Sequence, residues 1–273
     1  MQRVLITGAA GGIGGRLRQT LRGRYPILRL SDVKPLGEAG LGEAGPGEEI
    51  DRTDLGDLAA VERMMDGVDG VVHLGAVSSE DSWENILEAN IVGAYNVFEA
   101  ARRHDVERVV FATTNHVVGF YRRDRRLDNA AVPRPDSRYG VSKAFGEALG
   151  AFYADKFGLR VLCIRIGNVA DKLVDKRRLS IWISPRDMTQ LVRIGLEHPA
   201  LHFEIVYGVS NNVRSWWDDP AARRLGYRPR DRAEDYAAEV LRAEAGRPVD
   251  EIAELFQGGP FAAHEFDGDL DRL

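Results

Sequence analysis

Short apolar runs alternate with longer amphipathic stretches along most of the chain. Each run has the length of a buried strand, and each longer stretch predicts a helix. The predicted strands cover residues 3–6, 27–30, 70–76, 108–112, 160–166 and 203–207. The predicted helices end near residues 22 and 66, and cover about 83–104, 137–156 and 185–198. Strands that alternate with helices predict an α/β fold on a doubly wound parallel sheet, here in one domain over residues 1–273.

Three stretches between these elements carry separate predictions. Residues 36–49 are rich in glycine and glutamate without a period, and predict an exposed loop. Asp54 lies where the second helix opens and is a candidate cap for it. The arginine-rich segment 121–126 predicts a solvated loop, and the chain after Tyr207 predicts a charged helical tail.

Composition and charge are those of an ordinary globular protein. The chain has 273 residues, of which 44% are hydrophobic and 29% charged, with a formal net charge of −5. This balance gives no reason to expect binding to nucleic acid or to an anionic membrane. No apolar run approaches the roughly 18 residues that span a bilayer. The single cysteine, Cys163, excludes a disulfide within one chain. We expect a cytoplasmic protein with no metal site.

A glycine-rich turn joins the first predicted strand to the first helix. Residues 7–14 read Thr-Gly-Ala-Ala-Gly-Gly-Ile-Gly, in the strand–turn–helix context of a dinucleotide fingerprint. Gly8 permits the tight turn, Gly11 lets the backbone approach a pyrophosphate, and Gly14 lets the helix pack on the strand. The pyrophosphate would lie at the helix N-terminus, where free N–H groups favour an anion. The alternative is an ordinary strand–helix turn without a ligand.

An acidic residue ends the second predicted strand. Asp32 lies about 20 residues beyond the glycines, where a carboxylate binds the ribose hydroxyls of adenosine. A carboxylate there repels a 2′-phosphate, which favours NAD over NADP, although Lys34 lies close by. The alternative role for Asp32 is that of a turn residue at the strand end.

Small and polar residues follow the next two strands at their carboxyl ends, the edge where open α/β sheets bind ligands. Gly75 and Ala76 leave room for a cofactor beside the backbone, and Ser78 lies just beyond them. Residues 113–116, Thr-Thr-Asn-His, gather two hydroxyls, an amide and an imidazole. We favour a ligand site here over a solvated turn. Asn90, among apolar helical residues, is expected to make a structural hydrogen bond.

Tyr139 and Lys143 are four residues apart on the predicted helix 137–156, so they share one helix face. A free tyrosine has a pKa near 10 and is a poor base at neutral pH. A nearby ammonium favours the phenolate and lowers that pKa. The pair is therefore a candidate general base that works near pH 7. Alone, it would be interpreted as an accidental pair on a surface helix; the upstream motifs favour the base.

A basic stretch follows the strand 160–166 and contains Lys172, Lys176, Arg177 and Arg178. An arginine here could bind a substrate carboxylate through two parallel hydrogen bonds. The alternative is a run of solvated surface charge.

The motifs, in this order, resemble the extended short-chain dehydrogenase/reductase superfamily, which has a Rossmann fold. Over about residues 1–230 the resemblance is closer to the uronate dehydrogenases. The segments that carry it are His73–Ala76, Thr114–His116, Tyr139–Lys143, Arg165–Gly167 and Leu179–Trp182. The resemblance implies NAD-dependent oxidation at C1 of a hexuronic acid, such as glucuronate or galacturonate, to an aldaric acid lactone. It also implies a homo-oligomer, and a small C-terminal substrate-binding portion and tail at about 168–273.

The resemblance further implies roles for single residues. Tyr139 would be the base, Lys143 would tune it and anchor the ribose, and Thr114, in place of the usual serine, would orient the substrate hydroxyl. Arg177 would bind the C6 carboxylate, with Arg178 as the competing candidate. The other substrate contacts would be Ser78, Asn115, His116 and Asn168, the last of which stands where the family has a serine. NAD would contact Gly8, Gly11, Gly12, Ile13, Gly14, Asp32, Asp54, Leu55, Leu74, Gly75, Ala76 and Ile166, besides Tyr139 and Lys143.

Two other functions stay open. A nucleotide-sugar epimerase or dehydratase on the same scaffold usually carries a larger C-terminal lobe than the chain after Tyr207 supplies. A non-catalytic NAD-sensing protein commonly lacks the tyrosine or the lysine, and both are present here. The sequence does not rank galacturonate against glucuronate, because the two differ only at C4.

Overall fold

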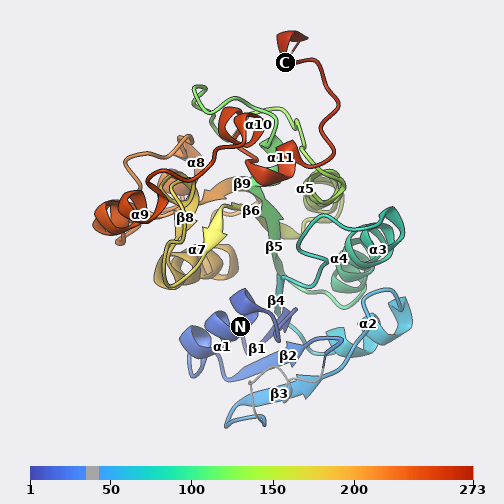
Figure 1. Cartoon of the computed structure of the whole chain (residues 1–273). Coiled ribbons are helices and arrows are strands. Elements are labelled where there is room, and N and C mark those ends of the chain that lie inside the picture. The colour runs from blue at the N-terminus through green and yellow to red at the C-terminus, as the bar shows by residue number, and fades with distance from the viewer. Residues whose placement is uncertain (35–42, 273) are drawn as a thin grey trace.

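A computed structural model of the chain describes residues 1–34 and 43–272. Seven strands form one parallel sheet in the order β3-β2-β1-β4-β5-β6-β9 (Figure 1). They are β1 (Arg3–Thr7), β2 (Ile27–Ser31), β3 (Glu48–Asp51), β4 (Gly70–His73), β5 (Arg108–Thr114), β6 (Arg160–Ile166) and β9 (Phe203–Gly208). The strand order reverses between β1 and β4, which opens a crevice at their carboxyl ends. The predicted doubly wound parallel sheet is confirmed.

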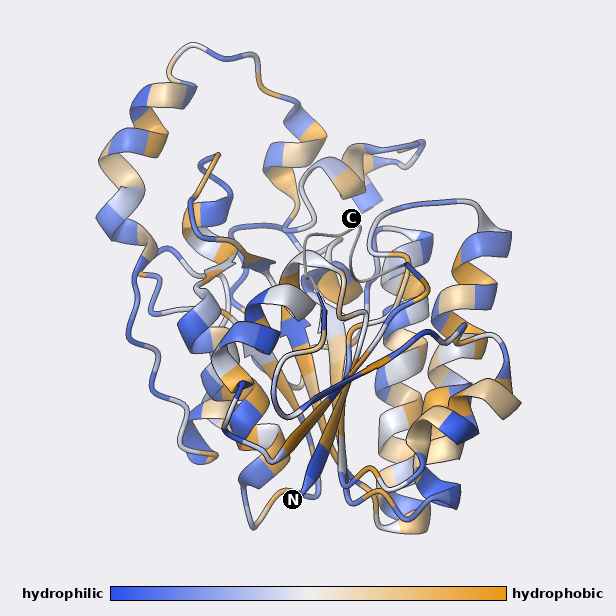
Figure 2. Cartoon of the chain, turned by 90° about the horizontal axis from the view of Figure 1, so that it is seen from below, coloured by the Kyte–Doolittle hydropathy of each residue, from blue (hydrophilic) through white to orange (hydrophobic). Residues whose placement is uncertain are grey.

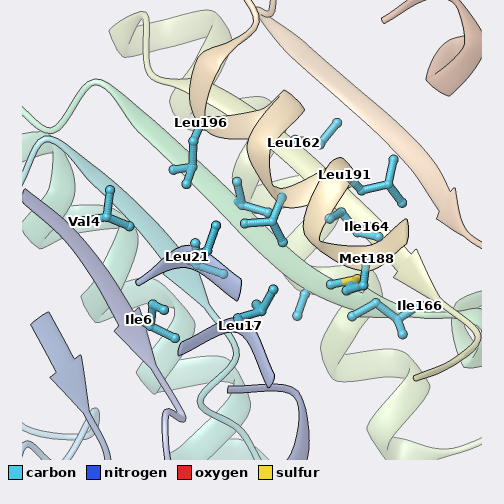
Figure 3. Packing of buried hydrophobic residues seen from close by; sticks show 14 of the residues in the cluster. Val4, Ile6, Leu17, Leu21, Leu162, Ile164, Ile166, Met188, Leu191 and Leu196 are labelled. Carbon is cyan, nitrogen blue, oxygen red and sulfur yellow. The ribbon is translucent and has the colours of Figure 1, made fainter. Parts of the chain in front are cut away.

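Helices cover both faces of this sheet. One face packs against α1 (Gly12–Leu21) and α7 (Pro185–Glu197), and the other against α2 (Leu58–Met65), α4 (Gly93–Arg103) and α5 (Arg138–Phe157). Side chains alternate along each strand, so in β1 Ile6 faces the first layer and Leu5 the second. Figure 3 shows the first layer, where α1 and α7 pack their leucines onto the strands. Figure 2 shows mostly apolar strands between helices that carry both hydrophobic and hydrophilic residues.

The remaining elements are short. They are α3 (Trp83–Ile86), α6 (Arg178–Ile181), α8 (Pro220–Arg224), α9 (Ala237–Glu244), α10 (Glu251–Leu255), α11 (Pro260–Ala263), the strand pair β7 (Asn168–Val169) and β8 (Trp182–Ile183), a π turn at Leu87–Val92, and 3-10 turns at Asn115–Val118, Ala233–Tyr236 and Leu270–Arg272. Of the helices in the described part of the chain, none is long and apolar enough to cross a membrane.

The loop predicted at residues 36–49 is only partly tested. Its part up to residue 42 lies outside the described residues, and at its end Glu48 and Glu49 belong to the edge strand β3. The prediction of a loop was wrong there. Glu48 pairs with Arg18 at 2.6 Å and Glu49 with Arg29 at 2.7 Å, so the strand is held by ion pairs that its own sequence does not reveal.

The cap of α2 is Asp57, not Asp54 as predicted. The Asp57 carboxylate accepts a hydrogen bond from the Ala60 N–H at 3.1 Å. Asp54 instead accepts from the Gly56 N–H at 2.9 Å, in the turn before the helix. Both positions suit an acidic residue, and the hydrogen-bond geometry distinguishes them.

Asn90 has the predicted structural role. It lies in the π turn between α3 and α4, where its amide accepts from the Val77 N–H at 2.8 Å and donates to the Val77 carbonyl at 3.0 Å. It also donates to Ser142 Oγ at 3.0 Å. The loop after β4 is therefore tied to α5, the helix that carries Tyr139.

The segment 121–126, predicted to be a solvated loop, is anchored to the end of the chain. Arg123 donates to the carbonyls of Ala253 and Phe256 at 2.6 and 3.1 Å. Its guanidinium also pairs with Glu254 at 2.9 Å. The prediction was wrong because these partners are far away in sequence.

The C-terminal segment packs back on the sheet instead of trailing away. The Trp217 ring is buried and stacks on Tyr207 of β9, with ring centroids 4.9 Å apart. Its indole N–H donates to the side chain of Gln257 at 2.7 Å. Residues 256–261 thereby reach the carboxyl edge of the sheet, beside α5 (Figure 1).

A buried ion pair fastens α5 to the sheet. Glu147 accepts two hydrogen bonds from Arg165 of β6, at 2.9 and 2.8 Å, and both side chains are almost fully buried. Thr113 of β5 donates to the same carboxylate at 2.9 Å. Because Glu147 is on the helix that carries Tyr139 and Lys143, this pair fixes the helix against the two strands beside the candidate site.

Glu147→Gln should lower the free energy of unfolding by about 3–5 kcal/mol, because it leaves the buried Arg165 charge without its partner. Urea denaturation at neutral pH measures the change. Asp235→Asn, which breaks the exposed pair with Arg232, should alter the same free energy by less than about 1 kcal/mol. Equal effects of the two substitutions would contradict this account of the buried pair.

Candidate active site

Two hydroxyl groups meet at the carboxyl edge of the sheet. Tyr139 lies in the first turn of α5, where Ser137 caps the helix by accepting from the Gly140 N–H at 3.0 Å. Thr114 is the last residue of β5 and hydrogen-bonds to the Tyr139 phenol. Both side chains are buried. The structure therefore brings together the tyrosine and the threonine that the sequence predicted as partners.

Burial shifts the pKa values of both Tyr139 and Lys143. It raises the pKa of Tyr139 to about 12, against a smaller lowering by the Thr114 hydrogen bond. Burial also lowers the pKa of Lys143 to about 8. The Lys143 ammonium lies 5.8 Å from the centre of the Tyr139 ring and 5.1 Å from that of Phe111. In the chain alone, the predicted lowering of the tyrosine pKa by Lys143 is not found, because desolvation of the phenolate is the larger effect.

The side chains of the polar cluster at residues 113–116 do not all point the same way, because successive side chains of a strand point to opposite faces of the sheet. Thr113 faces the opposite side and donates to Glu147, whereas Thr114, Asn115 and His116 lie on the side of Tyr139. With its amide oriented to suit both neighbours, Asn115 donates to the Ile166 carbonyl at 3.2 Å and accepts from Arg177 at 3.0 Å. Of the four predicted side chains, Thr113 thus has a structural partner, and the ligand-binding role of the other three stays a prediction.

Arg177 and Arg178 have different surroundings. Arg177 donates through Nε and Nη2 to the Gln257 carbonyl at 3.0 and 2.8 Å, and burial lowers its pKa to about 10. Among the described residues it has no carboxylate within ion-pair distance. Arg178 pairs with Asp175 and donates to Asn168 at 3.1 Å. Arg177 is thus the guanidinium better placed to receive a carboxylate from a ligand.

His116 is surrounded by residues that sequence reasoning did not identify. Its Nδ1 lies 2.7 Å from Asp136 Oδ2, and its ring stacks on Phe261 with centroids 3.9 Å apart. The Tyr139 ring meets it edge-on at 6.1 Å. Asp136 precedes a helix cap and Phe261 lies near the C-terminus, so neither carries a local motif that points to the site.

The glycine turn is shaped to receive a phosphate group. Gly8 has φ +68°, and a Cβ atom on it would lie 2.7 Å from the Gly75 nitrogen. A Cβ atom on Gly14 would lie 2.4 Å from the Gly8 carbonyl oxygen. Gly11 caps α1 without a side-chain hydrogen bond, so the first N–H groups of the helix point into the turn. This arrangement fits the pyrophosphate of a dinucleotide.

The two loops at this turn are joined by a buried contact. Thr7 accepts from the Gly75 N–H at 3.1 Å and lies 2.7 Å from His73 Nδ1. Burial lowers the pKa of His73 to about 3, so the imidazole is neutral. At the end of β2, the Asp32 carboxylate accepts from the Ala10 and Lys34 N–H groups, each at 3.0 Å. Asp32 therefore has the turn role that was its alternative, and its binding of a ribose stays a prediction.

The other predicted contacts lie around these groups. Leu74, Ala76 and Asn168 are half-buried beside the crevice, and Ile166 is buried at the end of β6. Ser78 and Asp54 are exposed, and the Leu55 carbonyl accepts from Asn96 at 2.7 Å. Within residues 1–34 and 43–272, no group of three or more acidic, histidine or cysteine side chains is arranged to hold a metal ion.

Gly14→Ala should lower the free energy of unfolding by about 1–3 kcal/mol and weaken NAD binding, because the new methyl group would press on backbone atoms of Gly8 and Ala9. Thermal unfolding with and without NAD measures both effects. Gly12→Ala is the matched control for the free energy of unfolding alone, since its methyl group would meet only the end of Arg16 at 3.4 Å. If both variants unfold like the wild type, the close packing at Gly14 is not required.

The comparisons with known proteins agree with this geometry. Residues 4–184 match the model of the NAD dependent epimerase/dehydratase family. The chain belongs to this family. It is 45% identical to a uronate dehydrogenase of Pseudomonas putida, over 95% of each chain. The resemblance to uronate dehydrogenases predicted from the motifs is confirmed.

Solved structures give the same result. A mutant of the uronate dehydrogenase from Agrobacterium tumefaciens, complexed with NAD, superimposes with a TM-score of 0.91 at 41% identity, over 96% of this chain and 97% of that one. The glucuronic acid dehydrogenase of Chromohalobacter salexigens also has a TM-score of 0.91, at 42% identity and the same coverage.

Proposed function

We propose that the chain catalyses the NAD-dependent oxidation of a hexuronic acid, glucuronate or galacturonate, at C1 to the aldaric acid lactone. The observation that supports this most strongly is the likeness to uronate dehydrogenases over nearly the whole chain, at 41–45% identity. The pairing of Tyr139 with Thr114 supplies the hydroxyl groups that such a reaction needs at one place.

NAD is the cofactor in this proposal. Its pyrophosphate binds at the turn and its adenosine ribose at Asp32, with Lys143 and Tyr139 at the nicotinamide end. The contacts extend to Gly8, Gly11, Gly12, Ile13, Gly14, Asp54, Leu55, Leu74, Gly75, Ala76 and Ile166. When bound, NAD supplies the acceptor for the hydride.

The sugar acid is held by side chains from three parts of the chain. Arg177, which lies beside Asn115 and has no carboxylate partner among the described residues, binds the carboxylate at C6. Thr114 orients the C1 hydroxyl. Ser78, Asn115, His116 and Asn168 bind the remaining hydroxyls. Residues from about 168 to 273 contribute the substrate-binding portion of the single domain.

Tyr139 acts as the general base. As phenolate it would remove the proton from the C1 hydroxyl of the cyclic sugar, and bound NAD would supply the acceptor for the C1 hydride. The ring stays closed, so the product is a lactone. Burial opposes the phenolate, and a positive nicotinamide with the charged form of Lys143 favours it. The cofactor therefore completes the charge balance of this base.

The proposal also covers the oligomeric state of the protein and its place in the cell. Large apolar side chains are exposed on α3, the π turn, α4 and α5, namely Trp83, Leu87, Val92, Tyr95, Val141, Phe145 and Phe152. This surface supports a homo-oligomer in which the helices of two copies pack together. We propose a cytoplasmic enzyme.

The alternatives are less well supported. The chain spans 93–97% of the uronate dehydrogenases, so it needs no additional lobe to account for their activity. A nucleotide-sugar epimerase or dehydratase would act on a nucleotide-linked sugar, and a non-catalytic NAD sensor would bind NAD without turnover.

A panel of substrates separates the three functions. Formation of reduced cofactor is followed by absorbance with glucuronate, galacturonate and a nucleotide-linked hexose, with NAD and with NADP. We expect turnover with a free uronate and NAD. Turnover restricted to the nucleotide-linked sugar would favour the epimerase or dehydratase, and tight NAD binding without turnover on any sugar would favour the sensor.

A further inference from the structure

A buried carboxylate behind His116 has no role in the function proposed above. Asp136 lies just before the cap of α5, and its side chain is 0% exposed. Its two oxygens have different partners: Oδ2 lies 2.7 Å from His116 Nδ1, and Oδ1 accepts from Ser137 Oγ at 2.8 Å. A buried carboxylate with both oxygens engaged has a fixed direction, so it can fix the group that it contacts.

We infer that Asp136 is a positioning residue for His116: it keeps the imidazole proton on Nδ1, so that Nε2 accepts a hydrogen bond from a hydroxyl of the sugar. The identity of the sugar rests on the proposed function. An ionised carboxylate can only accept, so the nitrogen that faces it must carry a proton. In the neutral imidazole the other nitrogen then has a free lone pair.

The Ser137 hydroxyl orients the carboxylate. Ser137 Oγ accepts from the Gly140 N–H of α5 at 3.0 Å, and its own proton goes to Asp136 Oδ1. A chain of hydrogen bonds therefore runs from the backbone of the helix that carries Tyr139, through Ser137 and Asp136, to the His116 ring. The imidazole is set relative to the catalytic phenol by this chain.

The C-terminal segment packs closely against the Asp136 carboxylate. A Cβ atom on Gly258 would lie 1.8 Å from Asp136 Oδ2, and one on Gly119 would lie 1.9 Å from it. The two glycines are joined by a backbone hydrogen bond of 2.9 Å. Only residues without side chains fit against the carboxylate here, so the approach of residue 258 excludes water from it.

Phe261 fixes the plane of the imidazole. Its ring lies 3.9 Å from that of His116, centroid to centroid, with an angle of 25° between the planes. With one edge held by Asp136 and one face covered by Phe261, the ring has one orientation. Its charged and titratable neighbours are Asp136, Tyr139 and, on the other side of Asn115, Arg177.

The test reads the position of the proton directly. In the wild-type protein with ¹⁵N-labelled histidine, two-bond ¹H–¹⁵N NMR spectra at neutral pH should show the His116 proton on Nδ1; His116→Gln assigns the signal. In Asp136→Asn the amide oxygen should still accept a hydrogen bond from the Ser137 hydroxyl, while the amide NH₂ group donates to His116 Nδ1. The imidazole proton should therefore move to Nε2. The kcat/KM for uronate should then fall about ten- to hundredfold, with NAD affinity unchanged.

The matched control is a second histidine–aspartate pair on the surface. His202 Nε2 lies 2.9 Å from Asp155 Oδ1 at the far end of α5. Asp155→Asn should leave kcat/KM unchanged. The inference would be overturned if the His116 proton of the wild-type protein lies on Nε2. It would also be overturned if the proton moves to Nε2 in Asp136→Asn while kcat/KM stays at the wild-type value. A loss of activity with the proton still on Nδ1 would show a structural role only. If the wild type oxidises no uronate, the proposed function fails, while the NMR spectra still decide the position of the proton.

Discussion

Tyr139→Phe is expected to lower kcat for uronate oxidation by about a hundred- to ten-thousandfold, because it removes the group that we propose takes the C1 hydroxyl proton. NAD affinity should change little, since the glycine turn and Asp32 are untouched. Steady-state rates of NADH formation and a separate NAD titration measure the two quantities. The phenylalanine ring keeps the apolar contacts of Tyr139 with His116 and Phe261, so the packing of the site is preserved.

The same helix supplies the control for this variant. Tyr153 is buried in α5 and donates to Glu99 at 2.9 Å, away from the candidate site. Tyr153→Phe removes a buried tyrosine hydroxyl without touching the proposed chemistry, so kcat should stay within a few-fold of the wild type. Equal losses of kcat in both variants would mean that the loss in Tyr139→Phe comes from damage to the helix.

The dependence of turnover on pH follows from the burial of the phenol. The pKa of Tyr139 is raised to about 12 in the chain alone, so little phenolate exists at neutral pH before NAD binds. Since the proposed mechanism requires the deprotonated form of Tyr139, turnover should rise as pH rises. Tyr139→Phe should lose this rise, which kcat measured across pH detects.

Arg177→Met is expected to lower kcat/KM for uronate by roughly a hundredfold, or about 3 kcal/mol, because the C6 carboxylate would lose its proposed buried partner. Most of the loss should appear in KM, since the carboxylate is bound equally before and during hydride transfer. The measurement compares kcat/KM for a uronate with kcat/KM for the neutral hexose of the same configuration. The ratio of the two values gives the discrimination between a carboxylate and an alcohol at C6. Arg177→Met should reduce that discrimination.

Arg178→Met is the matched control for the carboxylate site. Arg178 is engaged with Asp175 and Asn168, so its removal should change KM for uronate only a few-fold. A larger loss of discrimination in Arg178→Met than in Arg177→Met would reverse the assignment of the two arginines.

The central strands and the motif residues could be predicted from the sequence because their signals are local. An apolar run such as residues 108–112 is buried wherever the sheet forms, and the glycine turn follows directly on its strand. The spacing of Tyr139 and Lys143 fixes them on one helix face. These features need no knowledge of distant parts of the chain.

The rest of the site depends on partners that are far apart in sequence. Phe261 reaches His116, and the Gln257 carbonyl reaches Arg177, only because Trp217 and Arg123 hold the returning segment. No periodicity or motif marks these contacts. The edge strand β3 was missed for the same reason, since arginines elsewhere in the chain neutralise its glutamates.

The pKa of Tyr139 shows a second limit of sequence reasoning. Spacing places Lys143 near the phenol, but it does not reveal that both groups are buried or that the ammonium lies over the ring. Desolvation then shifts each pKa toward the neutral form, to about 12 for Tyr139 and about 8 for Lys143. The packing of the site therefore sets the direction of each shift. The proposed base depends on bound NAD to lower the pKa of Tyr139 again.

The most direct test of the proposed function follows the hydrogen at C1. Glucuronate or galacturonate deuterated only at C1 is incubated with the wild-type protein and NAD, and the reduced cofactor is analysed by mass spectrometry. We predict that the reduced cofactor carries the deuterium and that its formation is slower than with the unlabelled sugar when hydride transfer limits the rate. Reduced cofactor without deuterium, or none with either uronate, would contradict oxidation at C1.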